Sequence, residues 1–197
     1  MARYKDGHKQ EARDAIIKNA AERFRRDGIA GTGVRALMAD AGLTHGAFYA
    51  HFSSRAELVA SAIEYGAEST REQFETVLAT VPGDQKLQTF ISSYLRRQHG
   101  QQMGLGCTAA ALAPDIAREN SDTRARFTAQ TERLVHLISD LLPEGGTQVE
   151  RATRAKTVFA LMMGVLQLMR IETSPDAIER LMHEGRTAAL SLANQPW

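Results

Sequence analysis

The stretch from residue 41 to residue 52 reads AGLTHGAFYAHF and decides how the N-terminal part of the chain folds. Gly42 stands just past an expected short helix, where a left-handed residue ends the helix with a tight bend. Thr44 is placed to cap the helix that follows. Leu43 and Phe48 flank that helix start and can pack as a hydrophobic staple, which fixes the direction of the helix. These residues predict two short helices joined by a sharp turn.

The second of these helices, expected over residues 45–52, has two chemically different faces. Phe48 and Phe52 lie four residues apart on a face that predicts burial, whereas His45 and Tyr49 share another face with no role in a core. A short helix with one apolar face and one face of hydrogen-bonding side chains is typical of a recognition helix in a DNA groove. The alternative interpretation is an ordinary helical corner with solvent-exposed aromatic residues.

Helical patterns extend over the rest of the chain. Residues 10–26 carry an apolar stripe at helical spacing, and Gly28 ends this first helix. Two capping boxes, at residues 54–57 and 147–150, predict the starts of long helices. We therefore expect an all-α protein with about nine helices and room for a further turn after Pro114. The expected helices cover residues 10–26, 34–41, 45–52, 54–80, 84–98, 107–113, 121–142 and 147–170, with a last one from Pro175.

Residues 31–58, GTGVRALMADAGLTHGAFYAHFSSRAEL, resemble the TetR family of bacterial transcriptional regulators. The resemblance begins at Ile16. Its most specific part is the Ala-Gly-Leu-Thr run with the Gly, Phe, Tyr, His and Phe that follow, and a basic and an acidic residue just after them. It implies a three-helix, helix-turn-helix DNA-binding head over residues 1–53. It also implies a helical body over residues 54–197 that binds an effector and dimerises.

The resemblance further implies which residues contact DNA. His45 faces base edges, Tyr49 and His51 donate to phosphates, and Arg55 binds the DNA backbone where the family usually has lysine. The full set is Thr32, Gly33, Arg35, Thr44, His45, Gly46, Tyr49, His51 and Arg55. Most such contacts position the protein and few read the sequence. Gly33 stands where the family commonly has a capping Ser or Thr, which weakens the expected phosphate contact at the start of the second helix.

Charge is divided unevenly along the chain. Residues 1–55 contain 10 Lys and Arg against 6 Asp and Glu, a net charge of +4, and the remaining residues contain 14 against 17, a net charge of −3. A basic N-terminal part is expected if only that part meets a polyanion. The first ten residues hold no apolar run and the chain has one cysteine. These features predict a cytoplasmic protein without a signal peptide or a membrane partner.

The body of such a regulator is expected to hold an effector pocket between its long helices. The candidate lining residues are Tyr65, Phe74, Phe90, Tyr94, Met103, Cys107, Phe127, Met162, Leu166, Gln167, Met169 and Arg170. Gln167 and Arg170 are the polar members, so the set suggests a largely apolar effector with one polar handle. For each apolar member the alternative is a plain core residue.

Cys107 lies in the segment GLGCTAAALAP, residues 104–114, at the start of an expected short helix. Backbone amides at a helix start favour a reactive thiolate. Some family members with a cysteine after glycine at this place resemble electrophile- or oxidant-responsive repressors. The sequence leaves two interpretations open, a sensing thiol or a small buried residue packed near the pocket. His99, His136 and His183 lack metal-ligand spacing, and we expect no metal and no cofactor.

The helix expected over residues 147–170 is apolar nearly all round, so it must be covered on every side. The resemblance implies that this helix and the last one form a four-helix dimer interface. The expected contacts are Phe159, Met163, Leu166, Ile178, Leu181, Met182 and Ala189. Two heads in one homodimer would meet successive major grooves, about 34–36 Å apart, on a palindromic site. The alternative is a central core helix in a monomer.

The leading hypothesis is a TetR-type repressor that a small-molecule effector, with electrophiles as one candidate class, releases from a palindromic operator. Effector binding in the body would shift the helix that begins near Arg55 and move the two heads out of register. A second hypothesis is an effector-independent DNA-organising protein with a filled core. An enzyme is not expected, because the sequence has no phosphate loop, nucleophile elbow or HExxH motif.

Overall fold

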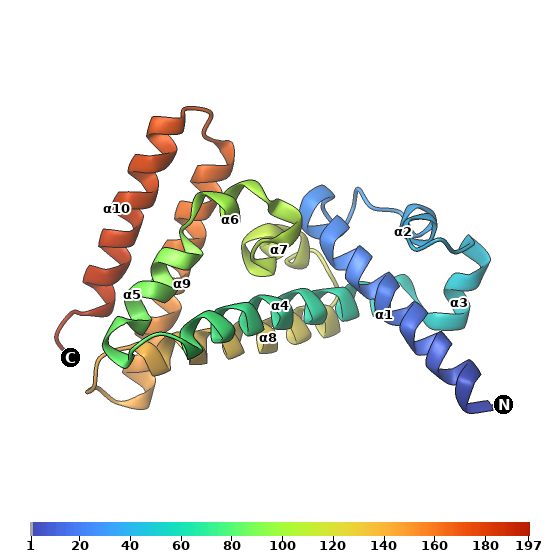
Figure 1. Cartoon of the computed structure of the whole chain (residues 1–197), viewed down its shortest axis with the longest axis horizontal. Helices are drawn as coiled ribbons and strands as arrows, with labels where there is room; N and C mark the ends of the chain where they lie inside the picture. Colours follow the sequence, from blue (N-terminus) through green and yellow to red (C-terminus); the bar gives the residue numbers. More distant parts are fainter. Residues whose placement is uncertain (1) are drawn as a thin grey trace.

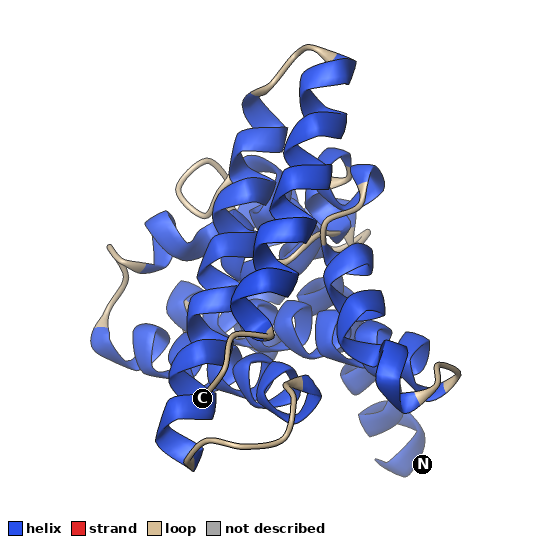
Figure 2. Ribbon diagram, turned by 90° about the vertical axis from the view of Figure 1, so that its left-hand side faces the viewer, coloured by secondary structure: helices blue, strands red, loops and turns tan. Residues whose placement is uncertain are grey.

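The computed structural model describes the backbone of residues 2–197 and the side chains from residue 9 onward. Within that range every regular element is a helix and no strand occurs (Figure 2). The expected all-α fold is confirmed. With η marking a 3-10 turn, the elements are α1 (Ala2–Asp27), α2 (Val34–Asp40), η1 (His45–Ala47), α3 (Phe48–His51), α4 (Arg55–Ala79), η2 (Gly83–Gln85), α5 (Lys86–Tyr94), α6 (Arg97–Gln101), η3 (Met103–Leu105), α7 (Thr108–Ile116), α8 (Ser121–Leu141), α9 (Gln148–Ile171) and α10 (Pro175–Ala193).

The helices form a small head at one end of the molecule and a larger body at the other (Figure 1). The head consists of α1, α2 and α3. The long helices α4 and α8 pack on each other and run away from the head, and α7 fills the space above them. At the far end α9 and α10 pack antiparallel, and Figure 2 views the molecule from their side.

Two groups of buried apolar side chains hold these helices together. One fills the body, around Phe90, Tyr94, Val158, Met162 and Leu166. The other joins the head to the body, because it combines residues of α1 to α3 with residues of α4 and α7: Ile16, Phe24, Leu37, Phe48, Phe52, Leu58, Ile63, Leu112 and Ile116. Since burying apolar surface is the main favourable term in folding, a movement of α4 or α7 must be felt in the head.

The single helix expected over residues 84–98 is broken into a short turn and two helices, α5 and α6. The break falls at Leu95 and Arg96, whose backbone leaves the helical conformation. Arg186 of α10 donates to the carbonyl oxygen of Leu95 through Nε, at 3.0 Å, and Nη2, at 2.6 Å. Arg186 lies 91 positions further along the chain, and it supplies the donor for the Leu95 carbonyl at the end of α5. The helical pattern of the sequence did not reveal this contact or the helix end.

Pro114 lies inside α7, which continues to Ile116 as one helix, so the expected helix end at residue 113 is wrong. Proline has no backbone N–H and leaves the carbonyl oxygen four residues earlier without its helical donor. That carbonyl belongs to Ala110, and the side-chain amide nitrogen of Gln167 on α9 donates to it. The proline is therefore tolerated because a neighbouring helix supplies the missing hydrogen bond.

Candidate nucleic-acid interface and body cavities

The turn between α2 and η1 is built as the sequence predicts. Gly42 has a φ of +70°, a left-handed conformation that is strained for a residue with a Cβ. The Leu43 N–H donates to the carbonyl of Met38 at 2.8 Å, and the Gly42 N–H to that of Ala39 at 2.9 Å. These bonds satisfy the last carbonyls of α2. Thr44 follows in extended conformation but its side chain makes no capping hydrogen bond, so the expected cap is wrong.

The helix expected over residues 45–52 consists of the 3-10 turn η1 and one α-helical turn, α3. Phe48 and Phe52 are 3% and 2% exposed, and their rings stack with centroids 5.5 Å apart. Tyr49 is 72% exposed. Its ring packs edge-to-face with the ring of Phe48, and the two ring centroids are 5.2 Å apart. The buried pair fixes this short element against the head, and Tyr49 extends from it into solvent.

His45 and Gly46 are exposed beside Tyr49, whereas the His51 ring is partly buried. Burial lowers the pKa of His51, and the positive charges of Lys9 and Arg13 lower it further. The ring is therefore neutral at neutral pH, and its Nδ1 is a buried atom without a hydrogen-bond partner. In this state His51 can offer a single N–H to a phosphate oxygen but no charge.

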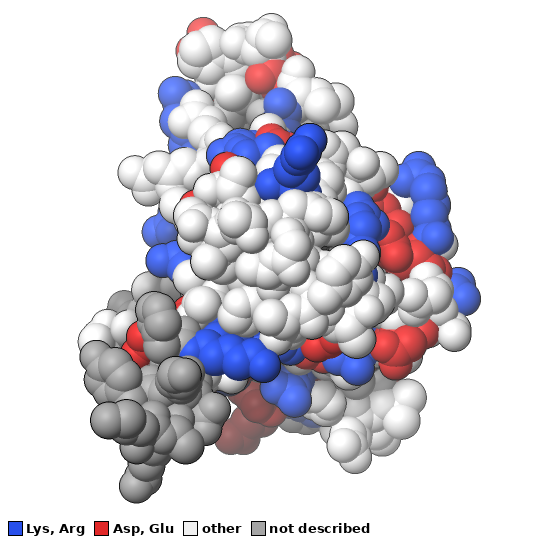
Figure 3. Space-filling model, turned by 90° about the vertical axis from the view of Figure 1, so that its right-hand side faces the viewer, with Lys and Arg blue, Asp and Glu red and all other residues white. Residues whose placement is uncertain are grey.

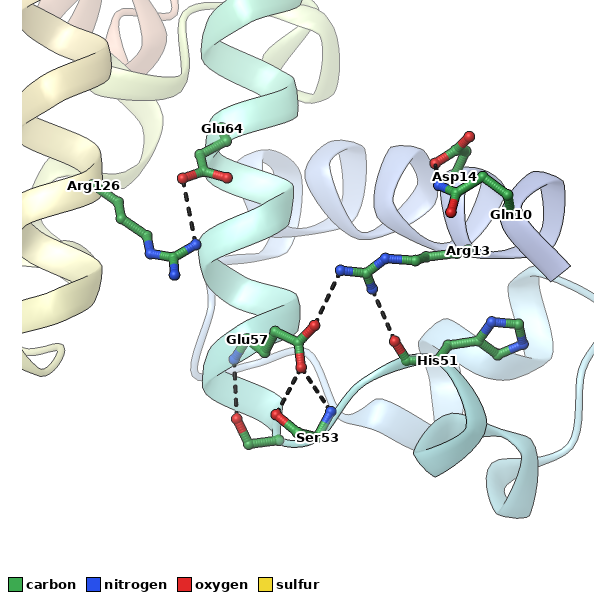
Figure 4. Close-up of polar contacts among 9 residues, drawn as sticks. Gln10, Arg13, Asp14, His51, Ser53, Glu57, Glu64 and Arg126 are labelled. Atoms are coloured by element: carbon green, nitrogen blue, oxygen red, sulfur yellow. Dashed lines mark hydrogen bonds and ion pairs between the residues drawn. The ribbon is translucent and has the colours of Figure 1, made fainter. Parts of the chain in front are cut away.

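Arg13 of α1 connects α3 to the start of α4 (Figure 4). Its Nη1 donates to the carbonyl oxygen of His51 at 2.9 Å, and its Nη2 pairs with the Glu57 carboxylate at 3.0 Å. The other Glu57 oxygen accepts from the backbone N–H and the hydroxyl of Ser53, both at 2.7 Å. The Arg13 guanidinium also lies 4.3 Å from the centroid of the Phe52 ring. The position of α3 is thus set from three sides.

The capping box expected at residues 54–57 is formed only in part. The Glu57 N–H donates to the Ser54 hydroxyl at 3.1 Å, as expected for an N-cap. The Glu57 carboxylate bonds to Ser53 in place of the Ser54 backbone, and this pairing, together with Arg13, holds the pKa of Glu57 below its ordinary value.

The start of α2 offers backbone groups and one cation. Thr32 is 1% exposed; its hydroxyl donates to the Gly28 carbonyl at 2.8 Å and its backbone N–H to the Ile29 carbonyl at 3.3 Å, so neither donor is free for a phosphate in this conformation. Gly33 is the exposed N-cap residue, and no side chain caps α2. Arg35 is exposed in the first turn. The amides of this turn remain available for an external acceptor.

Arg55 opens α4 beside the same surface. Its Nη2 donates to the carbonyl oxygen of Ile29 at 2.5 Å, and it lies 3.5 Å from the carbonyl oxygen of Thr32. Arg55 therefore fastens the loop between α1 and α2, while the residue as a whole stays exposed. Seen from the head end, the coloured part of this face has a largely uncharged centre, bordered by Lys and Arg side chains and, on one side and below, by Asp and Glu side chains as well (Figure 3).

The described residues of the head thus match a helix-turn-helix in sequence pattern and in shape. The profile described as "Bacterial regulatory proteins, tetR family" matches residues 16–62. Residues 16–62 thus carry the DNA-binding region that TetR-family transcriptional regulators share.

Individual TetR-family relatives agree along most of the chain. A relative from Bacillus subtilis (strain 168), described as the uncharacterized HTH-type transcriptional regulator YerO, is 27% identical over 190 residues. The match covers 87% of this chain and 63% of that relative's length, so it leaves more than a third of the relative unmatched.

Solved TetR-family structures share the fold. A TetR transcriptional regulator from Chloroflexus aurantiacus is 25% identical with a TM-score of 0.77, over 93% of this chain and 96% of that one. A TetR-family regulator from Cytophaga hutchinsonii has a TM-score of 0.78 over the same shares at 15% identity, which speaks for the fold alone.

The residues expected to line a TetR-type effector pocket do not all come together. Phe90, Tyr94, Met162 and Leu166 are fully buried in the body core, and Phe74 and Met169 are nearly so. Tyr65 is 39% exposed on a surface groove between α1, α4 and α8. Met103 is exposed on η3. The side-chain amide of Gln167 donates to the Ala110 carbonyl, which lacks a helical donor because of Pro114. The expectation of one shared pocket for these residues is wrong, because helical spacing does not tell which face of each helix is covered.

Two cavities lie in the body near Cys107. One, of about 170 Å³, opens between α4, α5 and α6, with Phe74, His99 and Leu105 among its lining residues. The other, of about 20 Å³, is bordered by Cys107, Phe127 and Phe159 and has room for about one water molecule. Thr70 borders both. Both are smaller than the roughly 300–1,000 Å³ common for ligand pockets, whereas the groove of about 700 Å³ that holds Tyr65 is open to the surface.

Cys107 is the N-cap residue of α7, as expected from the sequence, and is 2% exposed. Its backbone N–H donates to Nε2 of His99 at 2.8 Å. The other ring nitrogen of His99, Nδ1, is 2.6 Å from the carbonyl oxygen of Tyr94 and must carry the hydrogen. Burial lowers the pKa of His99 to about 4. A neutral imidazole therefore ties the start of α7 to the end of α5.

Sequence reasoning missed Arg25, which joins the head to the body. This residue of α1 is 7% exposed and donates from Nε to the Gly104 carbonyl, at 2.6 Å, and from Nη1 to the Thr108 hydroxyl, at 3.3 Å. A Cβ on Gly66 of α4 would overlap the Arg25 guanidinium, so this passage requires glycine. In the sequence Arg25 resembles an ordinary cation at a helix C-terminus, and Gly66 an isolated glycine in a helix.

The expected dimer contacts need correction as well. Phe159, Leu166 and Ala189 are 2%, 0% and 0% exposed within their own chain, and Ile178 and Met182 are nearly buried, so these residues cannot cover a second chain. Met163 and Leu181 are partly exposed. The apolar side chains that α9 leaves most exposed are Leu168, at 50%, and Ile171, at 76%.

Over the described part of the chain, no helix has both the length and the apolar character that crossing a membrane requires. The same described residues contain no group of three or more His, Cys, Asp and Glu side chains arranged to hold a metal ion.

Proposed function

We propose that this chain is a transcriptional repressor that binds a palindromic DNA operator through α3 and the turn before it. The observation that carries the proposal is the division of α3 into buried Phe48 and Phe52 and a Tyr49 that is 72% exposed. A large aromatic side chain held in solvent by a rigid element contributes nothing to the core. Its hydroxyl is a donor suited to a phosphate, and the helix is short enough for a major groove.

In this proposal the remaining contacts come from groups around Tyr49. His45 and Gly46 start the recognition element and meet base edges, with Thr44 beside them. His51 donates to a phosphate as a neutral ring. A second set at the start of α2 and α4 holds the DNA backbone through the amide of Gly33 and the cations Arg35 and Arg55, with Thr32 bracing the loop from inside. Backbone contacts of this kind set affinity and salt dependence, while the contacts to bases set sequence preference.

The test begins with selection of bound fragments from a random duplex library, followed by fluorescence anisotropy on the selected fragment. We expect a palindrome with half-site centres about one helical turn apart. Tyr49→Ala should weaken binding about five- to tenfold on all fragments and reduce the salt dependence. Tyr65→Ala is the matched control, because it removes another exposed tyrosine far along α4. Failure of the wild-type protein to bind any duplex at low ionic strength would refute the proposal.

We also propose that the binding form is a homodimer whose interface is the outer face of α9 and α10. Leu168 and Ile171 are exposed on α9, and Leu161 and Leu181 are only partly buried, so the helix pair offers an apolar surface. We expect Leu168→Glu to give monomers in analytical ultracentrifugation and to lower operator affinity. Val77→Glu, an equally polar change at a partly exposed position of α4, should leave the dimer intact. A monomeric wild type, or a dimeric Leu168→Glu variant, would contradict this interface.

Release by a small-molecule effector is the regulatory part of the proposal, with residues 1–53 as the DNA-binding unit and residues 54–197 as the sensing and dimerising unit. What supports it is the shared core of head, α4 and α7, and the contact of Arg25 with the segment just before Cys107. A ligand that moves this segment would release Arg25 and change how α1 lies on α4. A coupling of about 1–3 kcal/mol is enough for a useful switch.

Electrophiles remain one class of effector in this proposal, with Cys107 as their target. The thiol is 2% exposed, so a reagent reaches it only when the segment around η3 opens. The effector-independent DNA-organising protein is the second candidate function. The small cavities favour it, because none of those described inside the body reaches the size of a common ligand pocket. A compound that binds the body and releases DNA would exclude this second function.

A further inference from the structure

Arg170, near the end of α9, carries a positive charge that has no anionic partner among the described side chains. Its Nε and Nη2 are buried and make no hydrogen bond. The remaining nitrogen, Nη1, lies 3.5 Å from the Gln167 side-chain oxygen. Burial lowers the pKa of Arg170, and the groups that act in the opposite direction are Cys107 and Tyr94, neither of which is a carboxylic acid. The molecule has therefore buried a cation without neutralising it.

The two unpartnered nitrogens lie on the same edge of the guanidinium. The hydrogens of Nε and Nη2 point in nearly parallel directions, and this edge is the one that binds both oxygens of a carboxylate at once. Buried donors without acceptors are unfavourable, and buried charges are normally paired. The environment of Arg170 thus lacks one specific kind of group, an anion with two adjacent oxygens.

The surroundings of this edge supply further donors and no competing acid. The Tyr94 hydroxyl is fully buried; it makes no hydrogen bond to a nitrogen or oxygen, and the group it interacts with is the Cys107 thiol. Gly106 lies between the guanidinium and His99, and a Cβ there would come within 3.2 Å of Nη2 and 3.3 Å of the imidazole Cδ2. His99 is held neutral mainly by its burial, which lowers its pKa to about 4. Three polar groups, Nε and Nη2 of Arg170 and the Tyr94 hydroxyl, together with a glycine where a side chain would crowd them, make a polar environment suited to a single negative charge.

A cavity in the body comes near this position, although Arg170 is not among its lining residues. The cavity of about 170 Å³ has His99 and Leu105 in its wall, and Gly106 follows directly on Leu105. The 3-10 turn η3, which contributes Leu105 to the cavity wall, carries exposed Met103 and Leu105, with Gly104 inside the turn and Gly106 directly after it. A small movement of this turn would join the cavity to the guanidinium edge. The volume limits the ligand to a compact molecule.

We propose that Arg170 and Tyr94 form the anion-binding end of the effector site and that the effector is a compact carboxylate. The ligand's carboxylate accepts from Nε and Nη2 of Arg170, and its apolar part occupies the cavity lined by Phe74 and Leu105. This inference rests on the proposed function in taking the body as a sensing unit. This site also connects the ligand to the head. Arg25 of α1 donates to the Gly104 carbonyl in η3, so a displacement of η3 changes that hydrogen bond.

The test is isothermal titration calorimetry of the full chain with a size series of carboxylates, namely acetate, butyrate and benzoate. The matching uncharged amides acetamide, butyramide and benzamide serve as ligand controls. We expect at least one carboxylate to bind at least tenfold more tightly than its amide. Arg170→Gln should remove this preference and Tyr94→Phe should weaken it. Arg124→Gln, a loss of an exposed arginine on α8, should leave it unchanged.

A second measurement guards against misfolded variants. Because the unpaired cation is unfavourable without ligand, Arg170→Met should melt at a higher temperature than the wild type in the absence of carboxylate. A lower melting temperature would mean that the guanidinium already has a partner and would overturn the proposal. So would binding of none of the three acids, or equal binding of acids and amides. If none of the acids binds and the Cys107 thiol titrates differently in Arg170→Gln than in the wild type, the guanidinium serves that thiolate and the proposal is overturned.

Operator binding is measured separately, so the two failures differ. A chain that binds the acids through Arg170 but ignores every duplex refutes the proposed function and leaves this site standing. A chain that binds its operator but none of the acids refutes only this site.

Discussion

Lowering the pH from 7.5 to 5 should weaken the folded chain through His99. The ordinary imidazole pKa is 6.5, and burial lowers it to about 4 in the folded chain. The unfolded chain therefore binds a proton more readily. The stability contributed by the neutral ring is complete above pH 6.5, is lost as the pH falls below that value, and is fully lost near pH 4. At pH 5 these two pKa values correspond to about 2 kcal/mol lost.

The assay is thermal unfolding followed by circular dichroism at both pH values. For a chain of this length, 2 kcal/mol corresponds to a decrease of about 4–8 °C in melting temperature. His99→Gln keeps an acceptor for the Cys107 N–H but cannot take up a proton. Between pH 7.5 and pH 5 its melting temperature should therefore fall about 4–8 °C less than that of the wild type. His183→Gln removes an exposed histidine on α10 and should behave as the wild type. Equal pH dependence in wild type and His99→Gln would refute the buried neutral imidazole.

Three further changes test the contacts between distant helices. Gly66→Ala should destabilise the chain by about 1–3 kcal/mol in urea unfolding, because the methyl group displaces Arg25. Gly83→Ala, with nothing within 4 Å of its Cβ, should not, and equal stabilities would contradict the tight passage. Gln167→Ala should cost about 1–3 kcal/mol by the same measurement, since a buried carbonyl of α7 loses its donor, and an unchanged stability would show that water replaces it. A thiol reagent should release operator DNA from the wild type and leave Cys107→Ser bound, and equal release from both would remove the thiol from the proposed switch.

Local sequence was sufficient for most of the helices and for the turn of the head. Gly42 marks the end of α2 because its left-handed conformation is accessible mainly to glycine. The Thr147–Glu150 capping box was predicted from four residues and is fully formed at the start of α9. The burial of Phe48 and Phe52 and the exposure of Tyr49 follow from their spacing in the same way. Each of these features depends on neighbours a few residues away, so the chain specifies it before any helix meets another.

The sequence by itself determined the all-α fold, the helix-turn-helix and the outward position of Tyr49, because periodicity and capping act within one or two helical turns. Only the tertiary structure decided where α5 ends, how Pro114 is accommodated, which faces of α9 and α10 are covered, and that two nitrogens of the Arg170 guanidinium are buried without a partner. In all these cases the deciding group comes from another helix. The physical reason is that a hydrogen bond or a packing contact between residues far apart in the chain depends on how whole helices lie against one another, and no local pattern encodes that arrangement.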